Sequence, residues 1–447
     1  MKRIDDFFDF EVKNKLFDIV DEDGHRPWEA IRYYACCNVI NPIAISHMPY
    51  GGISVFKRAW HFLSMACSFF VYLMSQRNRR IMFLLCSRDK QDGLYYDKIS
   101  NDLFKLVDKS QTLALDTVWH SSDYKYKGLS SCASSIISLS SYIPHKYYSF
   151  SYDSINAKLK DHFPDFNLTV DEMMNYYHEF KVQYYFYKLL FRYSGIKKLF
   201  MVQNGIQKGL MAAAHEMGVE VIELQHGQIS RNHPAYSYPN CIEVSEEKIY
   251  HPAKLLTFGS FWHHGRFYPG VENIVIGNNS YANRAEMPST AGNKRVLVIS
   301  NKGDGELLAL HVKEILSKDN TFFFFFKLHP NQYEEFSYYK EMFGDSPNVQ
   351  VYSDELSINQ LLAKVDAIFL VQSTAELEAL RVGRKVYVIE ESNYQVMDFV
   401  FGEKGVYLVK DALDFIYCYY KHIDDLISPR DDLFMPFQSD VAKMLLN

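Results

Sequence analysis

A histidine followed by a glycine stands directly after the predicted strand 220–224. His226 lies between Gln225 and Gly227. Glycine lets the backbone turn sharply and leaves space beside the imidazole ring. An imidazole, with an ordinary pKa of about 6.5, is suited to accepting a proton at neutral pH. His226 is therefore a candidate general base. A hydrogen-bonded loop histidine is the alternative that the pattern leaves open.

A lysine and a histidine close the phenylalanine-rich run 321–327. Lys327 is the last residue of that run, and His329 and Pro330 follow after a single leucine. The ring of Pro330 fixes φ and with it the direction of the chain. A cation and an imidazole at one strand end suit a phosphate or diphosphate group. A capped strand end without a ligand explains the same residues.

Two hydroxyl residues, Ser373 and Thr374, open the predicted helix 375–382. Hydroxyls and backbone N–H groups at a helix N-terminus favour an anion, although ordinary N-capping uses the same groups. Glu376 and Glu378 follow in the first turns of this helix. Either carboxylate suits the hydroxyls of a ribose or sugar, and both equally suit the first turn of any helix.

Polar residues also follow other predicted strands. In open α/β sheets, ligands bind outside the carboxyl ends of the strands. Residues at such ends are therefore further cleft candidates, and they are Arg88, Gln225, Gly227 and Asn301.

Several catalytic motifs are missing from the chain. It contains no GxxxxGK[ST] loop, no GxGxxG after a strand, no HExxH and no GxSxG. The acidic run Asp21-Glu22-Asp23 lies in an early turn, not after a strand. These absences disfavour a dinucleotide oxidoreductase, a zinc protease, an ordinary esterase and a metal-dependent transferase of the single-lobe nucleotide-sugar fold. We expect no metal and no tightly bound cofactor.

The composition is that of a globular protein from a reducing compartment. The chain has 447 residues, 48% hydrophobic and 23% charged, with a net charge of -6. A general nucleic-acid binder is normally basic, so we expect no nucleic-acid partner. The seven cysteines are odd in number and form no CxxC pair, which predicts neither a disulfide framework nor a zinc site. The first residues lack a secretory apolar core, so we expect a cytoplasmic protein.

One stretch, residues 61–74, has the apolar character of a membrane-contacting helix. Its 14 residues are fewer than the ~20 that span a bilayer. A buried helix with solvated ends fits the stretch. An interfacial helix on anionic lipid fits it as well and would place the protein peripherally on the inner face of the cytoplasmic membrane. Basic residues flank it, namely Lys57, Arg58, Arg77, Arg79 and Arg80.

Strand-like runs alternate with helix-like segments along most of the chain, which predicts parallel sheets with helices on both faces. The segment 228–252, rich in Pro, His, Asn and Tyr, has the composition of an interdomain linker. The sequence thus predicts an α/β protein in three parts. A helical extension occupies 1–78, a first Rossmann-like lobe 79–245, and a second lobe with a C-terminal helix 246–447.

The order of these motifs resembles that of bacterial surface-polysaccharide transferases of the GT-B fold. It is similar to the order in CDP-glycerol glycerophosphotransferases, and its last two elements also resemble bacterial polysialyltransferases. The resemblance covers roughly residues 198–390, and more loosely Pro27-Trp28…Arg32 and Ser87-Arg88-Asp89, as in uncharacterised capsule-locus proteins. The stretches that carry it are 223–227 with 233–239, 326–330, and 373–380 before 383–386.

The resemblance implies a role for each candidate. His226, in the first lobe, would be the general base near the acceptor. In the second lobe Lys327, His329, Ser373 and Thr374 would hold the phosphate of the donor, and Glu378 its ribose or sugar. The acidic base motif of polysialyltransferases has no clear first-lobe counterpart, and the E-x7-E pattern of many retaining GT-B enzymes is missing around 376–390. The sialyl assignment and the stereochemistry stay open, although a histidine base favours inversion.

The residues are compatible with three functions. The first is a metal-independent glycosyltransferase that moves a sugar from a nucleotide-sugar donor to a saccharide or lipid-linked saccharide of a capsule or O-antigen. The second is a CDP-polyol phosphotransferase of teichoic-acid type. The third is an inert scaffold beside other polysaccharide synthases. We expect the first, because transfer needs a base for the acceptor hydroxyl and positive or N–H groups for the departing phosphate, and two lobes closing over a cleft exclude water.

Overall fold

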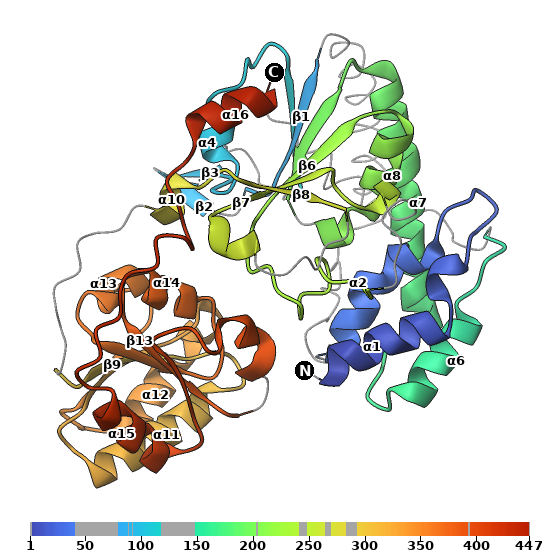
Figure 1. Cartoon of the computed structure of the whole chain (residues 1–447). Helices are drawn as coiled ribbons and strands as arrows, with labels where there is room; N and C mark the ends of the chain where they lie inside the picture. The colour runs from blue at the N-terminus through green and yellow to red at the C-terminus, as the bar shows by residue number, and fades with distance from the viewer. Residues whose placement is uncertain are drawn as a thin grey trace. The chain divides into compact units, whose positions relative to one another are not determined.

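The computed structural model of the chain divides into two compact units (Figure 1). The first unit comprises residues 1–258, 262–280 and 437–447, and the second comprises residues 259–261 and 281–436. The residues that the structure describes are 2–40, 79–87, 89–91, 93–117, 148–202, 204–240, 248–263, 270–282, 293–391 and 394–446.

The first unit is built on a parallel sheet of six strands in the order β4-β1-β5-β6-β7-β8. Apolar residues at the strand centres are buried, as expected for a parallel sheet between helices. The ring of Phe83 stacks on that of Phe200 in the neighbouring strand, with centroids 4.9 Å apart. The strands are β1 (Ile81–Leu85), β4 (Thr112–Asp116), β5 (Lys198–Met201), β6 (Glu220–Leu224), β7 (Lys254–Thr257) and β8 (Glu272–Val275).

Helices from the N-terminus and from the middle of the chain pack together in the first unit. The longest, α7 (Val170–Tyr193), begins with a capping box in which Thr169 Oγ1 accepts from the Glu172 amide at 3.2 Å. Pro27 starts α2, at a position where the missing N–H of proline costs no hydrogen bond. The other elements are α1 (Lys2–Lys13), η1 (Leu16–Asp18), α2 (Pro27–Ile40), β2 (Asp89–Gln91), β3 (Leu94–Tyr96), α4 (Asn101–Phe104), α6 (Asp153–His162), η3 (Asn204–Ile206), α8 (Lys208–Glu216), η4 (Lys248–Tyr250), α10 (Asn279–Ala282) and α16 (Ser439–Leu446).

The remainder of the predicted helical extension, residues 41–78, lies outside the described residues, and so does the apolar stretch 61–74. Within the part of the chain that the structure describes, no helix combines the length and the apolar character needed to cross a membrane.

The division between the units differs from the boundary expected at residues 245 and 246. β7 pairs with β6, and β8 pairs with β7, so residues 254–275 extend the first sheet. The chain also returns to the first unit at its end, where Ala442 of α16 is buried in the core of that unit. Local sequence shows a strand but not the sheet that it joins, which explains the difference.

The second unit also contains a parallel sheet of six strands, in the order β11-β10-β9-β12-β13-β14. Phe324 and Phe326 of β10 are fully buried in its core. The strands are β9 (Arg295–Ile299), β10 (Phe323–Lys327), β11 (Val349–Tyr352), β12 (Ala367–Leu370), β13 (Lys385–Ile389) and β14 (Val406–Val409), and the helices are α11 (Gly305–Lys318), η6 (Pro330–Glu335), α12 (Phe336–Phe343), α13 (Ile358–Leu362), α14 (Ala375–Arg381), η7 (Tyr394–Val400) and α15 (Ala412–Lys421). The short helix η5 (Ser260–His263) begins in the second unit and ends in the first.

The two sheets confirm the predicted fold class of two Rossmann-like parallel-sheet lobes. Counted along the chain, the strands of the second sheet run in the Rossmann order 3-2-1-4-5-6. The chain therefore builds one half of this sheet outward from β9 and then returns to build the other half from β12. In the first sheet, the direction in which the chain adds successive strands reverses between β1 and β5. Such reversal points are where α/β sheets leave a crevice for ligands.

Candidate functional site

Three adjacent strands of the second unit carry predicted site residues at their carboxyl ends, two of them predicted donor-binding residues and one a cleft candidate. Asn301 follows β9, His329 follows β10 and Ser373 follows β12. β9 lies between β10 and β12, and it pairs in parallel with both. Because neighbouring parallel strands end at the same edge of a sheet, the three loops come together. They surround the reversal point between β9 and β12, where a ligand crevice is expected.

A buried hydrogen-bond chain ties the loops after β9 and β10 to each other. Ser300 Oγ donates to Gln332 Oε1 at 2.7 Å, and Gln332 Nε2 donates to Tyr339 Oη at 3.0 Å. A Cβ atom added to Gly305, at the start of α11, would lie 2.1 Å from Tyr339 Oη. Only glycine fits beside this chain, which holds the loops of Asn301 and His329 in a fixed relation.

His329 is an exposed residue that also caps η6. Its Nδ1 accepts a hydrogen bond from the Asn331 amide at 3.2 Å. Partial burial lowers the pKa of His329, which favours the neutral ring at neutral pH. Since Nδ1 is the acceptor, the neutral ring carries its proton on Nε2. His329 can therefore cap the strand end and still present an N–H donor to a phosphate oxygen.

Lys327 is mostly buried, and its ammonium group donates a hydrogen bond to the carbonyl of Ser353. Its Nζ lies 5.5 Å from the ring centre of Tyr333. Burial lowers the pKa of Lys327, and the nearby Asp354 and Glu355 partly oppose that shift. The contacts of Lys327 link β10 to the segment after β11. Binding of a donor phosphate by Lys327 stays a prediction.

At the start of α14, the protein's own side chains cap the backbone N–H groups. Ser373 Oγ accepts from the Ala375 amide at 3.2 Å, and Glu376 Oε1 accepts from the Ser373 amide at 3.1 Å. This is the ordinary capping that the sequence left open as an alternative. Thr374 is exposed and Glu378 is half-buried on the same short helix. Donor binding by Ser373, Thr374 and Glu378 stays a prediction.

Glu376 is the fully buried carboxyl group of this helix. Its Oε2 has no hydrogen-bond partner among the described residues. Burial raises the pKa of Glu376 to about 8, with the hydrogen bond from the Ser373 amide acting in the opposite direction. The group is therefore protonated at neutral pH. The sequence did not distinguish Glu376 from Glu378, because burial depends on which helix face meets the sheet.

In the first unit, Gln225 anchors the turn that carries His226. Its side chain is fully buried, with Oε1 accepting from the Phe258 amide at 2.7 Å and Nε2 donating to the Gly227 carbonyl at 2.8 Å. These bonds join the end of β6 to the end of β7. A Cβ atom added to Gly227 would meet nothing within 4 Å, so open space lies beside this glycine. Ligand contact by Gln225 and Gly227 stays a prediction.

His226 is partly exposed and belongs to a cluster of polar side chains that the sequence did not reveal. Its Nδ1 lies 3.4 Å from Tyr236 Oη, and the Tyr236 hydroxyl donates to Glu223 Oε1 at 3.1 Å. Tyr236 and Glu223 are fully buried. Burial, with a smaller contribution from His226, lowers the pKa of His233 to about 3. One sequence signal pointed to this cluster, since a carboxylate inside a buried strand is rare unless it is paired.

The segment 233–239, which carries Tyr236, is packed against α2 and is not a linker. Arg32 Nη1 donates to the Pro234 carbonyl at 3.0 Å, and the Arg32 guanidinium lies 3.9 Å from the ring centre of Tyr238. Arg32 is itself held by Glu11, whose two carboxylate oxygens accept from it at 2.6 and 3.0 Å. The expectation of a linker over 228–252 was wrong here, because buried polar pairs and aromatic rings fix this segment.

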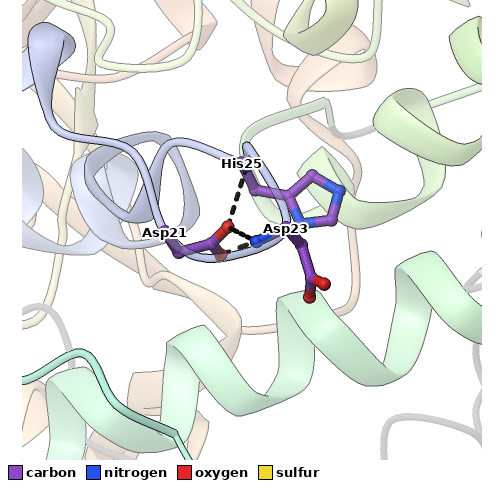
Figure 2. Close-up of side chains that lie close together, drawn as sticks. All are labelled: Asp21, Asp23 and His25. Atoms are coloured by element: carbon purple, nitrogen blue, oxygen red, sulfur yellow. Dashed lines mark hydrogen bonds and ion pairs between the residues drawn. The ribbon is translucent and has the colours of Figure 1, made fainter.

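A second cluster, far from any strand end in the sequence, joins Asp21, Asp23 and His25 (Figure 2). Ligand atoms of these three residues lie within 4.8 Å of one another, a spacing that could hold a metal ion. The ammonium group of Lys181 occupies the position between them, however. Its Nζ lies 2.5 Å from Asp21 Oδ2, 2.7 Å from Asp23 Oδ2 and 3.0 Å from His25 Nδ1.

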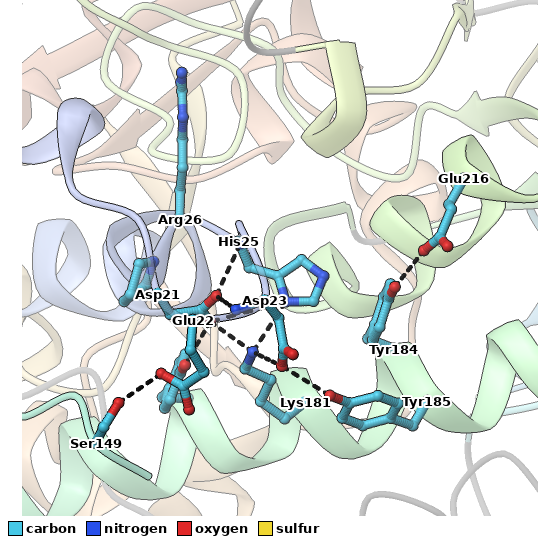
Figure 3. A network of polar contacts seen from close by, with 12 residues as sticks. Asp21, Glu22, Asp23, His25, Arg26, Ser149, Lys181, Tyr184, Tyr185 and Glu216 are labelled. Carbon is cyan, nitrogen blue, oxygen red and sulfur yellow. Dashed lines mark hydrogen bonds and ion pairs between the residues drawn. The ribbon is translucent and has the colours of Figure 1, made fainter.

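Tyrosine hydroxyl groups complete this cluster (Figure 3). Tyr177 donates to Asp21 at 2.6 Å, and Tyr185 donates to Asp23 at 2.7 Å. Although burial acts to raise it, hydrogen bonds from Lys181 and Tyr177 lower the pKa of Asp21. Burial and the charge of Lys181 lower the pKa of His25. Lys181 thus bridges the two carboxylates, and the cluster fixes the turn before α2 onto α7.

A surface depression of about 430 Å³ lies beside this cluster. None of the site residues predicted from the sequence lines it. Its lining residues are Asp23, His25, Tyr184, Tyr185, Lys188, Ala212, His215, Glu216 and Ile249. The cleft candidate Arg88 lies outside the described residues.

Comparison with known proteins yields similarity of fold only. No protein-family model matches the sequence, and no curated protein does. Among solved structures, UDP-GlcNAc 2-epimerase from Methanocaldococcus jannaschii in complex with UDP-GlcNAc and UDP is similar, with a TM-score of 0.46, 10% identity, and coverage of 82% of this chain and 99% of that chain.

Two further solved structures are similar at the same level. UDP-GlcNAc 2-epimerase from Neisseria meningitidis bound to UDP-GlcNAc has a TM-score of 0.45, 13% identity, and coverage of 82% of this chain and 98% of that chain. MurG from Acinetobacter baumannii has a TM-score of 0.43, 9% identity, and coverage of 82% and 99%. At these scores the similarities do not bear on what the chain binds or catalyses.

Proposed function

We propose that this protein is a metal-independent, nucleotide-sugar-dependent glycosyltransferase of GT-B type that extends a capsular or O-antigen polysaccharide. The observation that carries the proposal is the strand order of the second unit, which reverses beside the loops of Asn301, His329 and Ser373. Sheets with this order bind the diphosphate of a nucleotide in the crevice at the reversal point.

The proposed donor site uses neutral N–H donors and side-chain hydroxyl groups to bind the diphosphate. The Nε2–H group of His329 is suited to a phosphate oxygen, because its Nδ1 is already engaged by the Asn331 amide. Donors that are held in place by the fold stabilise the charge on a departing nucleotide without reorganisation. Lys327 adds positive charge near the same strand end, and Ser373 and Thr374 add hydroxyl groups.

The proposed chemistry is the displacement of the nucleotide by an acceptor hydroxyl. The acceptor oxygen forms a bond to the anomeric carbon, the bond from that carbon to the phosphate oxygen breaks, and a base takes the hydroxyl proton. We assign the role of this base to His226, which is partly exposed and lies on a turn fixed by Gln225. The acceptor is a saccharide or a lipid-linked saccharide on the cytoplasmic side.

The assignment of His226 is tested by separating donor binding from transfer. Wild-type protein is supplied with sugar nucleotides of several bases and an oligosaccharide acceptor, and released nucleotide is measured. His226→Ala should keep nucleotide binding and lose transfer by about a factor of 10² to 10⁴, the usual contribution of a general base. His215→Ala removes an exposed histidine from α8 and should leave both unchanged.

Two outcomes would change the proposal. Transfer that persists in His226→Ala would contradict the base assignment. Release of CMP together with phosphorus in the product, from CDP-glycerol or CDP-ribitol, would replace sugar transfer with polyol-phosphate transfer.

A further inference from the structure

A chain of three polar side chains leads from the interior of the first unit to His226. Glu223 comes from near the carboxyl end of β6, Tyr236 from the segment after the histidine turn, and His226 from the turn itself. The Tyr236 oxygen is 3.1 Å from Glu223 Oε1 and 3.4 Å from His226 Nδ1. Only His226 is exposed to solvent to any extent, whereas the other two side chains are fully buried.

The hydrogen bonds of this chain have a defined direction. A tyrosine has one proton, and the shorter of the two contacts gives it to Glu223. In its contact with His226, the tyrosine oxygen is then the acceptor. The acceptor role of that oxygen requires a proton on His226 Nδ1, so the neutral ring has its lone pair on Nε2.

We infer that Glu223 and Tyr236 are positioning residues that hold the proton of His226 on Nδ1 and make Nε2 the proton-accepting nitrogen. This inference rests on the proposed function, because it supplies the base of that reaction with its correct tautomer. When Nε2 takes the proton of the acceptor hydroxyl, the Nδ1–H group of His226 remains hydrogen-bonded to the Tyr236 oxygen. The Tyr236 proton continues to point at Glu223 Oε1, so the ring keeps its orientation when it becomes positively charged.

The surroundings of Tyr236 keep its hydroxyl protonated. Burial and the adjacent Glu223 raise the pKa of Tyr236 well above its ordinary value. The proton therefore stays on the tyrosine, and the chain orients the ring of His226 without itself transferring protons. His233, the other histidine of the cluster, accepts from the Ala235 amide through Nδ1 at 3.3 Å and so carries the opposite tautomer.

The direct test is nitrogen NMR of protein labelled in its histidine side chains, without any substrate. Comparison with His226→Gln assigns the signals of His226. We expect wild-type His226 to be protonated on Nδ1, and we expect the proton to move to Nε2 in Tyr236→Phe. A wild-type His226 ring protonated on Nε2, or a ring whose tautomer is the same in Tyr236→Phe, would overturn the inference.

A matched pair at Glu223 tests the same point without removing the tyrosine. Glu223→Gln keeps an oxygen that accepts from Tyr236, so His226 should keep its proton on Nδ1. Glu223→Met fills similar space without an acceptor, so the freed Tyr236 hydroxyl should donate to Nδ1 and move the ring proton to Nε2. Identical tautomers in the two variants would contradict a role for Glu223.

Kinetics then connect the tautomer to transfer. Tyr236→Phe and Glu223→Met should each lower kcat by about a factor of 10², with the KM for the donor unchanged, and Glu223→Gln should recover most of the loss. In the His226→Ala background Tyr236→Phe should cause no further loss, because the residues act as one unit. A further loss in that background would show a merely structural role for Tyr236. If the NMR result holds while His226→Ala retains transfer, the base assignment fails and the tautomer assignment stands.

Discussion

At the residue scale, the second unit contains a carboxyl group that is protonated at neutral pH, where carboxyl groups are ordinarily ionised. Glu376 is a fully buried carboxyl group on α14, and one of its oxygens has no partner among the described residues. Burial raises the pKa of Glu376 to about 8. Ser373, which donates to its other oxygen, is a predicted donor-binding residue. The protonated Glu376 side chain is therefore hydrogen-bonded to the loop that carries the proposed phosphate site.

This buried carboxyl group gives stability a measurable dependence on pH. The unfolded chain releases the proton near pH 4.5, whereas the folded protein keeps it until about pH 8. The contribution of the group is therefore complete below pH 4.5 and is lost as the pH rises through about 8. Glu376→Gln removes this titration, so its stability relative to wild type should increase across that range, by at most about 1.4 kcal/mol per pKa unit.

Urea unfolding at both ends of that pH range measures the effect. Glu378→Gln, which removes a half-buried carboxyl group from the same helix, serves as the control. A stability difference between Glu376→Gln and wild type that is the same at both pH values would contradict the raised pKa.

Residue types and strand ends predicted the candidate histidines, but not the groups that orient them. His226 and His329 could be found because each follows an apolar run, which is a local pattern. Tyr236 contacts His226 only because the segment after the turn folds back over β6. The side-chain capping at Ser373 likewise depends on the rotamers of two residues, which no pattern of residue types fixes.

At the scale of elements, α2 is the support on which the segment 233–239 is built. Arg32 bonds to Glu11 of α1 and to the carbonyl of Pro234, and it stacks on Tyr238. Arg32 and Glu11 are both almost completely buried. Such a pair contributes little net stability while intact, yet breaking it leaves a buried charge without its partner.

Removal of Arg32 should therefore destabilise the first unit and loosen this segment. Arg32→Leu should lower the free energy of unfolding by about 3–5 kcal/mol, because Glu11 loses its charged partner and keeps only the hydrogen bond from Trp28 Nε1. The double variant Glu11→Leu/Arg32→Leu should recover much of that loss. Urea unfolding measures the energy, and amide hydrogen exchange of residues 235–238 should become faster in the single variant. Unchanged exchange there would contradict the supporting role of α2.

Most elements were predictable because their signals are local. The strands β9, β10, β12 and β13 follow from continuous apolar runs, and Gly383, which follows the C-cap Val382 of α14, has a φ of 70°. Residues 254–275, which contain β7 and β8, were assigned to the second lobe, but both strands extend the first sheet. Their pairing with β6 depends on the chain packing back onto the first sheet, and the Tyr- and Pro-rich composition of 228–252 concealed that return.

At the scale of the whole molecule, the chain consists of two units that each contain a six-stranded parallel sheet. The alternation of strands and helices predicted this class. The exact division was not predictable, because α16 returns to the first unit through Ala442, which fills its core, and through the bond from Lys198 Nζ to the Leu445 carbonyl at 2.8 Å. These contacts connect residues more than two hundred positions apart in the sequence.

The central claim is that the second unit binds the nucleotide of a sugar donor. The most direct measurement is the thermal stability of the purified protein with UDP, GDP, CMP, CDP or dTDP and without added metal. A ligand that binds only the folded state adds about 2.7 kcal/mol of stability at a hundredfold excess over its Kd.

We predict that one nucleotide raises Tm in wild type and in His226→Ala, and that the increase is reduced in His329→Asn. Asparagine can keep the cap on the Asn331 amide but cannot supply the Nε2–H donor. A failure of all five nucleotides to raise Tm, or an equal increase in His329→Asn, would contradict the account.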